Sequence, residues 1–344
     1  MKVKARRSEM GKLPQFSVII PTYNRLGLLS RTLASIRNQR FNDYEIIVID
    51  DGSTDRTWEY LSSVDHSIKA FRQDNQGAGP ARNLGASKAR GRYFAFLDSD
   101  DVWFPWTLAT FFELIRKRGE PAILSGKLIE FSEASDLETI ADEGIAADVF
   151  TNYLAASRTI KFVGSNNMVL RRDVFFGSGG FVDGRLNCED HDLMLRLGLA
   201  PGFVQVLAPT TLGWYRHAAS ETSDLRSTVD GLSRMIRQER IGAYPGGVTR
   251  AKQRQCLLTS HTRAAAVGCL RADRLADAWR LYLSTLGWNA KLRRWKHILL
   301  FPVLATAACC APRNLMSKRS QQGLLGSAHN SVPPLRAKSP RWPL

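Results

Sequence analysis

The 344-residue chain has few cysteines, and their arrangement is not typical of a metal or disulfide framework. Five are present, an odd number, and none forms a Cys-x-x-Cys pair. Zinc sites need closely spaced ligands, and small disulfide scaffolds need a dense, even set of cysteines. The sequence therefore indicates neither kind of site, and it fits a reducing compartment.

Long apolar runs are missing too. No uninterrupted run reaches the roughly 18–20 apolar residues that a membrane-spanning helix needs. Residues 1–15 are basic but contain no apolar segment, so they do not resemble a secretory signal. We therefore expect a flexible basic leader over residues 1–14 and a cytoplasmic location.

Acidic residues are absent from the C-terminal part of the chain. Residues 291–344 contain ten Lys or Arg and no Asp or Glu, whereas the net charge of the whole chain is +16. Most of the excess charge therefore lies in this tail. Such a balance favours an anionic partner, which can be nucleic acid, a membrane surface or a phosphorylated substrate.

Three common signatures of nucleotide or nucleic-acid binding are also absent. No Gly-x-Gly-x-x-Gly follows the first apolar run, which argues against a dehydrogenase. The glycine-rich segment Gly77–Gly85 lacks the Lys-Ser/Thr pair of a P-loop. No recognisable nucleic-acid motif is present, so charge alone supports a nucleic-acid partner.

What the sequence does contain is an alternation of short apolar runs with amphipathic segments. It predicts strands over residues 16–20, 45–50, 68–72 and 93–98, and helices over residues 26–39 and 80–89. Strands that alternate with helices of this length are typical of βαβ units. The predicted fold class is therefore α/β, with a mostly parallel sheet flanked by helices.

The rest of the chain is predicted to be irregular at first and then helical. The expected elements are a helix over 105–118, strands over 122–131, 166–171 and 203–207, a surface loop over 132–148, and helices from 224 to 318 with a hairpin at 264–287. Residues 291–311 join basic and aromatic side chains to an apolar stretch broken by Pro302. Two interpretations of that stretch stay open: an interfacial helix on anionic lipid, or a helix buried against the α/β domain.

One predicted strand leads directly into three carboxylates. The apolar run Tyr93–Leu97 is followed by Asp98, Asp100 and Asp101. Open α/β sheets place ligands at the carboxyl ends of their strands. Mn²⁺ and Mg²⁺ take oxygen ligands, often one or two carboxylates together with substrate phosphates. The spacing fits a metal carried on a diphosphate, although a solvated acidic turn would have the same sequence.

Five segments together resemble the family 2 glycosyltransferases, which are inverting enzymes of the GT-A fold. The segments are residues 16–25, 45–55, 77–85, 96–101 and 188–197. The resemblance implies a nucleotide-sugar-binding and catalytic domain of the GT-A class over residues 15–222. A C-terminal helical region over residues 223–318, which we expect near a membrane, and a disordered tail over residues 319–344 complete the predicted organisation.

The resemblance implies which residues bind the nucleotide. Asp51 would accept a hydrogen bond from the uracil ring, although a helix-capping role for this turn is the plainer interpretation. Pro21 and Tyr23 would line the same pocket, with a core role for the Tyr23 ring as an alternative. Arg82, beside the glycines of its segment, is a candidate partner for phosphate.

The resemblance also implies a metal site. Asp98 and Asp100 match the family's DxD motif and would hold Mn²⁺ or Mg²⁺ on the diphosphate, with Asp98 also contacting the nucleotide. Asp101 is a possible third participant. His217 resembles a histidine that completes the metal site in some relatives, but a single histidine is more often structural.

The acidic pair Glu189-Asp190 is implied to carry the chemistry. An inverting transfer needs one carboxylate to accept the acceptor's hydroxyl proton, and the resemblance assigns that role to Asp190. Glu189 would orient Asp190 or contact a substrate. For the sugar or acceptor, the candidates are Trp103, Ser165 and Asn166, and a core role competes for the tryptophan.

The sequence thus predicts an inverting, metal-dependent glycosyltransferase. It would move a hexosyl or related group from a nucleotide-diphospho-sugar, with UDP preferred, to a polysaccharide, lipid-linked or other cell-surface glycan. We expect it to be peripheral on the cytoplasmic face of the membrane, with an anionic surface as partner and no nucleic acid. The alternative is a non-catalytic scaffold of the same fold that binds a nucleotide or glycan, against which the intact DxD and Glu-Asp pairs argue.

Overall fold

The structure is a computed structural model that describes residues 13–63, 67–159, 164–185, 187–217 and 224–310, with no side-chain description for residues 309 and 310. The chain forms two compact units that separate between Ser220 and Glu221. The predicted domain boundary lay between residues 222 and 223. The predicted leader and tail lie outside the described residues.

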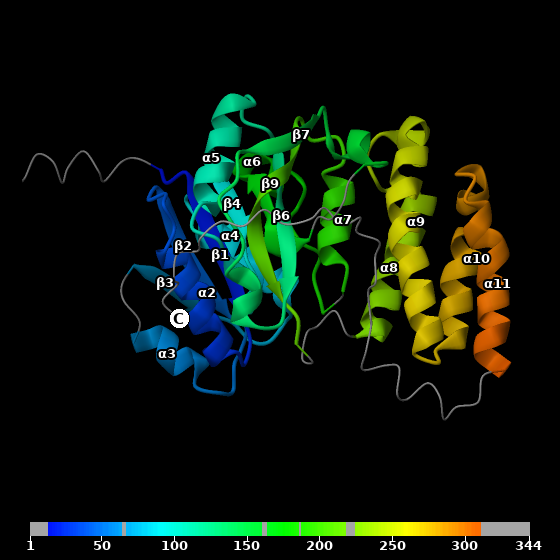
Figure 1. Cartoon of the computed structure of the whole chain (residues 1–344), viewed down its shortest axis with the longest axis horizontal. Helices are drawn as coiled ribbons and strands as arrows, with labels where there is room; N and C mark the ends of the chain where they lie inside the picture. The colour runs from blue at the N-terminus through cyan, green and yellow to red at the C-terminus, as the bar shows by residue number, and fades with distance from the viewer. Residues whose placement is uncertain (1–12, 64–66, 160–163, 186, 218–223, 311–344) are drawn as a thin grey trace, which may run out of the picture. The chain divides into compact units, whose positions relative to one another are not determined.

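The first unit is built on one mixed sheet, coloured blue to green in Figure 1. Its strands are β1 (Phe16–Thr22), β2 (Tyr44–Asp50), β3 (Ile68–Arg72), β4 (Tyr93–Phe96), β5 (Val102–Trp103), β6 (Ile123–Phe131), β7 (Ala146–Phe150), β8 (Met168–Arg171) and β9 (Phe203–Tyr215). They are ordered β3-β2-β1-β4-β8-β6-β9-β5, and β7 pairs with β9. The half formed by β1 to β4 is parallel, whereas β8 is antiparallel to both β4 and β6. The predicted α/β class with a mostly parallel sheet is confirmed.

Helices cover both faces of the parallel half because its strands are apolar on both sides. The helices of this unit are α2 (Leu26–Arg37), α3 (Thr57–Ser63), α4 (Ala78–Lys88), α5 (Thr107–Lys117), α6 (Arg172–Gly177) and α7 (Glu189–Arg196). On β1, Val18 and Ile20 share one core with Leu33 of α2 and Phe111 of α5. The intervening Ile19 points to the opposite face, towards α4. The result is the helix–sheet–helix sandwich of a doubly wound protein.

A glycine fixes how closely α4 approaches the sheet. A Cβ at Gly85 would lie 2.5 Å from Cγ2 of Ile19 and 3.3 Å from Cγ1 of Ile49. Only a residue without a side chain allows this contact. The helix that carries Arg82 is therefore held directly against β1 and β2.

Several predicted elements differ from the observed ones. The strand predicted to stop before Pro21 continues to Thr22, because β4 has already ended there and the missing Pro21 N–H has no ladder partner to lose. The predicted 203–207 strand extends to Tyr215 as β9, paired with β6 across bulges. The predicted surface loop 132–148 contains a 3₁₀ turn, η1 (Ala134–Leu137), and the start of β7, whose side chains are largely exposed and gave no apolar pattern.

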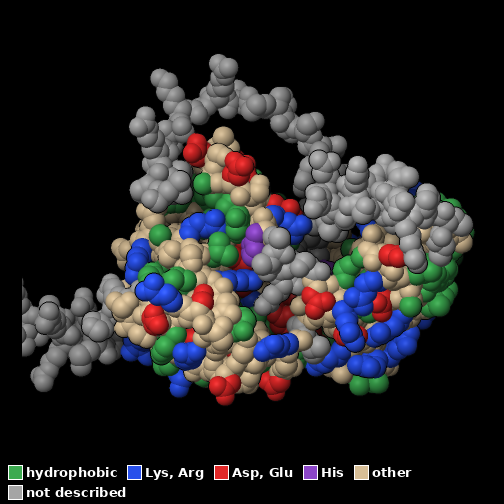
Figure 2. Space-filling model, turned by 90° about the horizontal axis from the view of Figure 1, so that it is seen from below, with side chains coloured by type: hydrophobic (Ala, Val, Ile, Leu, Met, Phe, Trp, Pro, Cys, Tyr) green, Lys and Arg blue, Asp and Glu red, His purple; other side chains and the backbone are tan. Residues whose placement is uncertain are grey.

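The second unit is a helical bundle, coloured yellow to orange in Figure 1. Its helices are α8 (Leu225–Arg240), α9 (Gly247–Arg271), α10 (Leu275–Lys291) and α11 (Trp295–Cys310). The predicted hairpin corresponds to α9 and α10, and the predicted helix beyond residue 310 lies outside the described residues. Figure 2 shows Lys and Arg side chains beside hydrophobic ones on the surface of this unit. In the described part of the chain, no helix is long and apolar enough to cross a membrane.

Candidate active site

The carboxyl ends of three adjacent parallel strands carry the candidate residues. In the order β2-β1-β4, these strands lead into Asp50-Asp51, into the loop Tyr23–Arg25, and into Asp98–Asp101. Asn24, with a positive φ of 52°, ties two of the loops together, since its Oδ1 accepts hydrogen bonds from the amides of Thr54 and Asp55. The loops that follow β1 and β2 are therefore one connected surface at this edge of the sheet.

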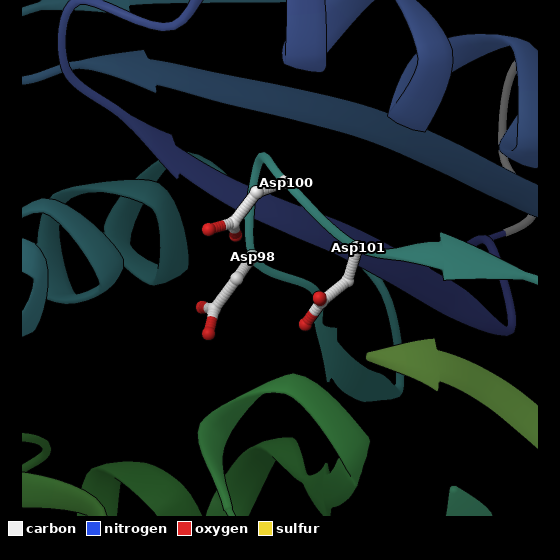
Figure 3. Close-up of side chains that lie close together, drawn as sticks. All are labelled: Asp98, Asp100 and Asp101. Carbon is white, nitrogen blue, oxygen red and sulfur yellow. The ribbon is translucent and has the colours of Figure 1, made fainter. Parts of the chain in front are cut away.

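The three carboxylates of the DxD segment converge, as Figure 3 shows. Asp98, Asp100 and Asp101 each offer an oxygen, and these oxygens lie within 4.8 Å of one another. Burial raises the pKa of Asp98 and, to a larger extent, that of Asp101, and the neighbouring carboxylates add to both effects. Three crowded carboxyl groups of this kind favour a bound cation.

Asp101 differs from its two neighbours in that both of its carboxyl oxygens accept hydrogen bonds from the protein. The Asn166 amide donates to Oδ2 at 2.7 Å, and the backbone amide of Tyr215 donates to Oδ1 at 2.9 Å. The side chain is 1% exposed. Asp101 therefore joins the DxD turn to two other segments of the sheet and is poorly placed to bind a ligand.

Asp100 is held by two cationic or ionisable side chains from distant segments. Oδ2 accepts a hydrogen bond from Arg25 Nη1 at 2.8 Å and lies 2.9 Å from Nε2 of His217. Arg31 supports the same turn by donating to the Asp100 carbonyl. His217 thus lies beside the DxD segment, and its part in a metal site stays a prediction. Arg25 received no role from the sequence, although its position after β1, next to β4, could have indicated one.

Arg82 connects the DxD segment to the acidic pair. Its Nη2 donates to Asp98 Oδ1 at 2.6 Å, and its Nη1 donates to Glu189 Oε1 at 3.0 Å. The guanidinium is almost fully buried and lies 5.3 Å from the centre of the Phe181 ring. Because both ends of its fork are paired with carboxylates, the contacts favour a positioning role over the phosphate contact expected from the sequence.

The acidic pair begins α7. Cys188, in the left-handed region with φ 71°, precedes the helix, and Glu189 and Asp190 lie in its first turn. Burial raises the pKa of Glu189 to about 7, despite the opposing effect of Arg82. Asp190 accepts hydrogen bonds from the backbone amides of His191 at 2.7 Å and Ser165 at 3.3 Å. The carboxylate at the helix start is thus fixed by backbone donors.

The segment around Ser165 and Asn166 connects the DxD segment to the acidic pair of α7. It forms a 3₁₀ turn, η3 (Ser165–Asn167), where a strand was predicted from residue 166. Ser165 contacts Asp190, and Asn166 contacts Asp101. The structure therefore brings both sequence candidates to the site, where their observed contacts are to the acidic side chains.

Asp51 has a different set of contacts from those expected. Its carboxylate accepts hydrogen bonds from Gln73 Nε2 and from the backbone amides of Gln76 and Gly77, at 2.7, 2.9 and 2.8 Å. Gly77 has a φ of 103°, which glycine adopts readily. A carboxylate offers about four lone-pair positions, so one remains for a nucleotide. The uracil contact stays a prediction, and Asp51 already organises the glycine-rich loop.

The remaining candidates, Pro21, Tyr23 and Trp103, differ in how far their side chains are exposed to solvent. Tyr23 is 41% exposed at the end of β1, whereas Pro21 is buried within that strand. Trp103 is 5% exposed and belongs to the hydrophobic core. The structure therefore gives Trp103 a packing role in place of the sugar contact, and it leaves Tyr23 accessible.

The donor set fits a hard divalent cation. Asp98 Oδ2 and Asp100 Oδ1 accept no hydrogen bond from the described residues, and both belong to carboxylates that already converge. Carboxylate oxygens are the ligands that Mn²⁺ and Mg²⁺ prefer. Asp98 and Asp100 could thus hold the ion, with the His217 imidazole alongside.

The sheet order and the position of the site define the class of protein. The chain has the GT-A fold followed by a C-terminal helical extension. Residues 17–176 match the model of glycosyl transferase family 2, and this segment belongs to that family.

Curated relatives resemble the chain over part of its length. A GalNAc(5)-diNAcBac-PP-undecaprenol beta-1,3-glucosyltransferase of Campylobacter jejuni is 41% identical over 113 residues, which are 31% of this chain and 36% of that protein. An uncharacterized glycosyltransferase of Nostoc is 31% identical over 46% of this chain and 52% of its own. For a Rickettsia bellii relative, the matched part is only 13% of that protein. The chain thus spans about half or less of these relatives.

A solved structure matches most of the chain. S. aureus TarS residues 1–349, solved in complex with UDP-GlcNAc, superposes with a TM-score of 0.66 at 19% identity. The superposition covers 91% of this chain and 93% of that one. At this level of identity, the likeness concerns the fold.

Proposed function

We propose that the protein is an inverting glycosyltransferase that moves a sugar from a nucleotide-diphospho-sugar to a hydroxyl group. The observation that carries the proposal is the Arg82 bridge, which joins a DxD carboxylate to the acidic pair of α7. A site for a diphosphate and a candidate base are thereby held together at the carboxyl edge of the sheet. This arrangement is what a direct displacement at an anomeric carbon needs.

The donor is bound by the loops after β1, β2 and β4. The accessible ring of Tyr23 and the remaining lone pair of Asp51 are proposed to contact the nucleobase of the donor, and UDP is the preferred nucleotide. A divalent ion, Mn²⁺ or Mg²⁺, would neutralise the charge that develops on the diphosphate leaving group. Asp98 and Asp100 would hold it, with His217 positioned by its contact with Asp100.

Asp190 is the proposed base. It accepts the proton of the acceptor hydroxyl while the oxygen attacks the anomeric carbon from the face opposite the diphosphate. The new C–O bond forms as the bond to the diphosphate breaks, and the nucleoside diphosphate leaves. The amides of Ser165 and His191 hold the Asp190 carboxylate in place, and Glu189 with Arg82 positions its helix turn.

The acceptor is proposed to be a polysaccharide, a lipid-linked glycan or another cell-surface glycan. The name of the Campylobacter jejuni relative describes transfer to an undecaprenol-linked oligosaccharide, which supports a lipid-linked acceptor. We place the protein peripherally on the cytoplasmic face of a membrane, where such an acceptor would be reached.

The test is turnover across UDP-, dTDP- and GDP-sugars, with Mn²⁺ or with EDTA. UDP-GlcNAc is the first donor to try, because TarS was solved with it. We expect Asp190→Asn to lower transfer about 10²–10⁴-fold while donor binding persists. Asp100→Ala should abolish the response to metal.

The matched control is Asp173→Asn, which makes the same change at an exposed carboxylate outside the site. If Asp190→Asn transfers the sugar at the normal rate, Asp190 is not the general base. Donor binding without turnover by the wild type, on any donor and acceptor, would favour the scaffold alternative.

A further inference from the structure

Helix α11 is apolar on two opposite sides. Phe301 and Ala305 are 1% exposed on the side that packs on the bundle, where Phe301 stacks on Tyr282. Five other side chains are each more than half exposed: Trp295, Leu299, Leu300, Val303 and Leu304. Their spacing puts them together on the other side of the helix. We call these five residues the apolar face of α11.

Cationic side chains surround the start of the same helix. Lys291, Arg293 and Lys296 are exposed there. Arg294 and Arg263 of α9 both bind Thr259, the first through the hydroxyl and the second through the carbonyl, with Arg263 Nε 3.0 Å away. We call these five cations the basic corner, and Thr259 is its anchor.

Among the described residues, no carboxylate forms an ion pair with any of the five cations of the basic corner. Burial and the charge of Arg294 lower the pKa of Arg263. Burial, Arg263 and Arg294 together lower the pKa of His297 to about 4, so this neighbour stays neutral. The positive potential of the corner is therefore not balanced within the bundle, and it favours an anion from outside.

We propose that the apolar face of α11 and the basic corner dock on a bilayer that contains anionic phospholipid. The helix would lie in the plane of the membrane, with its exposed leucines and valine at the boundary of headgroups and acyl chains. Trp295 would lie at the level of the headgroups, and the exposed side chains of Lys291, Arg293 and Lys296 would contact lipid phosphates.

Charge and shape both favour this occupant. Apolar side chains next to unbalanced cations match a surface that is apolar below and anionic above. A 16-residue helix that contains Pro302 suits an interface, and no described helix is long and apolar enough to span the bilayer. The inference rests on the proposed function in one respect, since docking would bring the enzyme to a membrane-borne acceptor.

The experiment is flotation of the full chain with vesicles of phosphatidylcholine alone or mixed with phosphatidylglycerol, without donor or metal. We expect binding to the anionic vesicles only, weakened at high salt. Leu299→Asp with Val303→Asp should abolish it. Lys296→Gln, and separately Lys291→Gln, should each weaken it about fivefold, since both cations are exposed.

The controls make the same changes elsewhere on the bundle. Val248→Asp alters a 93% exposed apolar residue in the first turn of α9, and Arg226→Gln alters an exposed cation of α8. Both should bind as the wild type does. Circular dichroism of each variant separates lost docking from lost folding.

Three results would overturn the proposal. The first is equal binding to neutral and anionic vesicles, and the second is unchanged binding of the Leu299→Asp, Val303→Asp variant. The third is a concentration-dependent dimer in sedimentation that this variant abolishes, because a second copy would then cover the face. Vesicle binding is independent of turnover, so loss of the proposed function would leave this result intact.

Discussion

At the scale of single residues, Arg82 connects the DxD segment to the acidic pair of α7. It is 3% exposed, and it pairs with Asp98, in the turn after β4, and with Glu189 of α7, which are far apart in the sequence. Those carboxylates raise the pKa of its guanidinium, although burial acts against them. A planar fork with several donors can bridge two carboxylates, whereas an ammonium acts as a single point charge.

Removal of the Arg82 charge should destabilise the first unit. We expect Arg82→Met to lower the free energy of unfolding by about 3–5 kcal/mol at pH 8, because it leaves buried carboxylates unpaired. At pH 5 the loss should be smaller, since Glu189, whose pKa is raised to about 7 by burial, can then bind a proton. Urea denaturation at both pH values measures this, with Arg82→Lys as the charge-preserving control. An equal loss at the two pH values would contradict it.

Glu189 should make stability depend on pH. Its pKa rises from 4.5 to about 7 on folding, because burial outweighs the Arg82 charge. A carboxyl group with a raised pKa stabilises the folded state fully below pH 4.5, and this contribution is lost as the pH rises through 7. The difference between pH 4.5 and pH 8 is on the order of 3 kcal/mol.

Glu189→Gln provides the comparison, because its amide oxygen can still accept from Arg82. The variant should lack that part of the pH dependence, measured by urea unfolding between pH 4.5 and pH 8. If the two proteins lose stability in parallel as the pH rises, Glu189 does not carry the effect.

At the scale of elements, the contact between α4 and β1 decides where Arg82 can reach. Gly85→Ala would put a Cβ 2.5 Å from Ile19, so α4 must shift away from the sheet. Overpacking of this kind costs about 1–3 kcal/mol. We expect the variant to lose stability, and to lose transfer activity because Arg82 moves with the helix.

The matched control is Gly27→Ala in α2, where the added Cβ meets no atom within 4 Å. That substitution should stabilise the protein by up to about 1 kcal/mol, since alanine favours a helix. Thermal denaturation and a transfer assay measure the stability and the activity of both variants. Similar behaviour of the two would show that the close approach of α4 has no consequence.

The turn η3 marks a limit of prediction at this scale. Residues 166–171 read as one strand, yet 165–167 form a 3₁₀ turn before β8 begins. Asn166 and Ser165 bind Asp101 and Asp190, which come from other elements. These contacts override the local preference for a strand. They cannot be predicted from the segment itself, because their partners lie elsewhere in the chain.

At the scale of the whole molecule, the second unit has its own buried anchor. Arg254 donates from Nε to Glu239 at 2.6 Å and also binds the carbonyls of Pro245 and Gly247, and both side chains are 2% exposed. The pair therefore joins α8, α9 and the turn between them. Its contacts all lie within the helical unit.

Loss of this pair should affect one unit more than the other. Arg254→Met should destabilise the helical unit by about 3–5 kcal/mol, because the Glu239 charge stays buried. Hydrogen exchange resolved by segment should show lost protection in α8 to α10 and retained protection in β1 to β4. The exposed ion pair between Arg280 and Asp230 gives the control, since Arg280→Met should lower the free energy of unfolding by less than about 1 kcal/mol. Equal loss of protection in both units would show that they unfold together.

The sequence by itself determined the α/β class, the parallel strands, the position of the acidic segments at strand ends, and the family. These properties follow from local periodicity and from motifs in a fixed order, which a chain carries before it folds. It also indicated His217, Ser165 and Asn166, which contact Asp100, Asp190 and Asp101 and whose functional roles stay predictions.

Only the tertiary structure decided what those side chains contact. It paired Arg82 with Asp98 and Glu189, gave Arg25 a place on Asp100, turned Asp51 towards the glycine-rich loop, and buried Trp103 in the core. Each of these outcomes joins residues that are far apart in the chain. Their partners depend on strand order and on which face each side chain takes, and the alternation within one strand does not specify its neighbours.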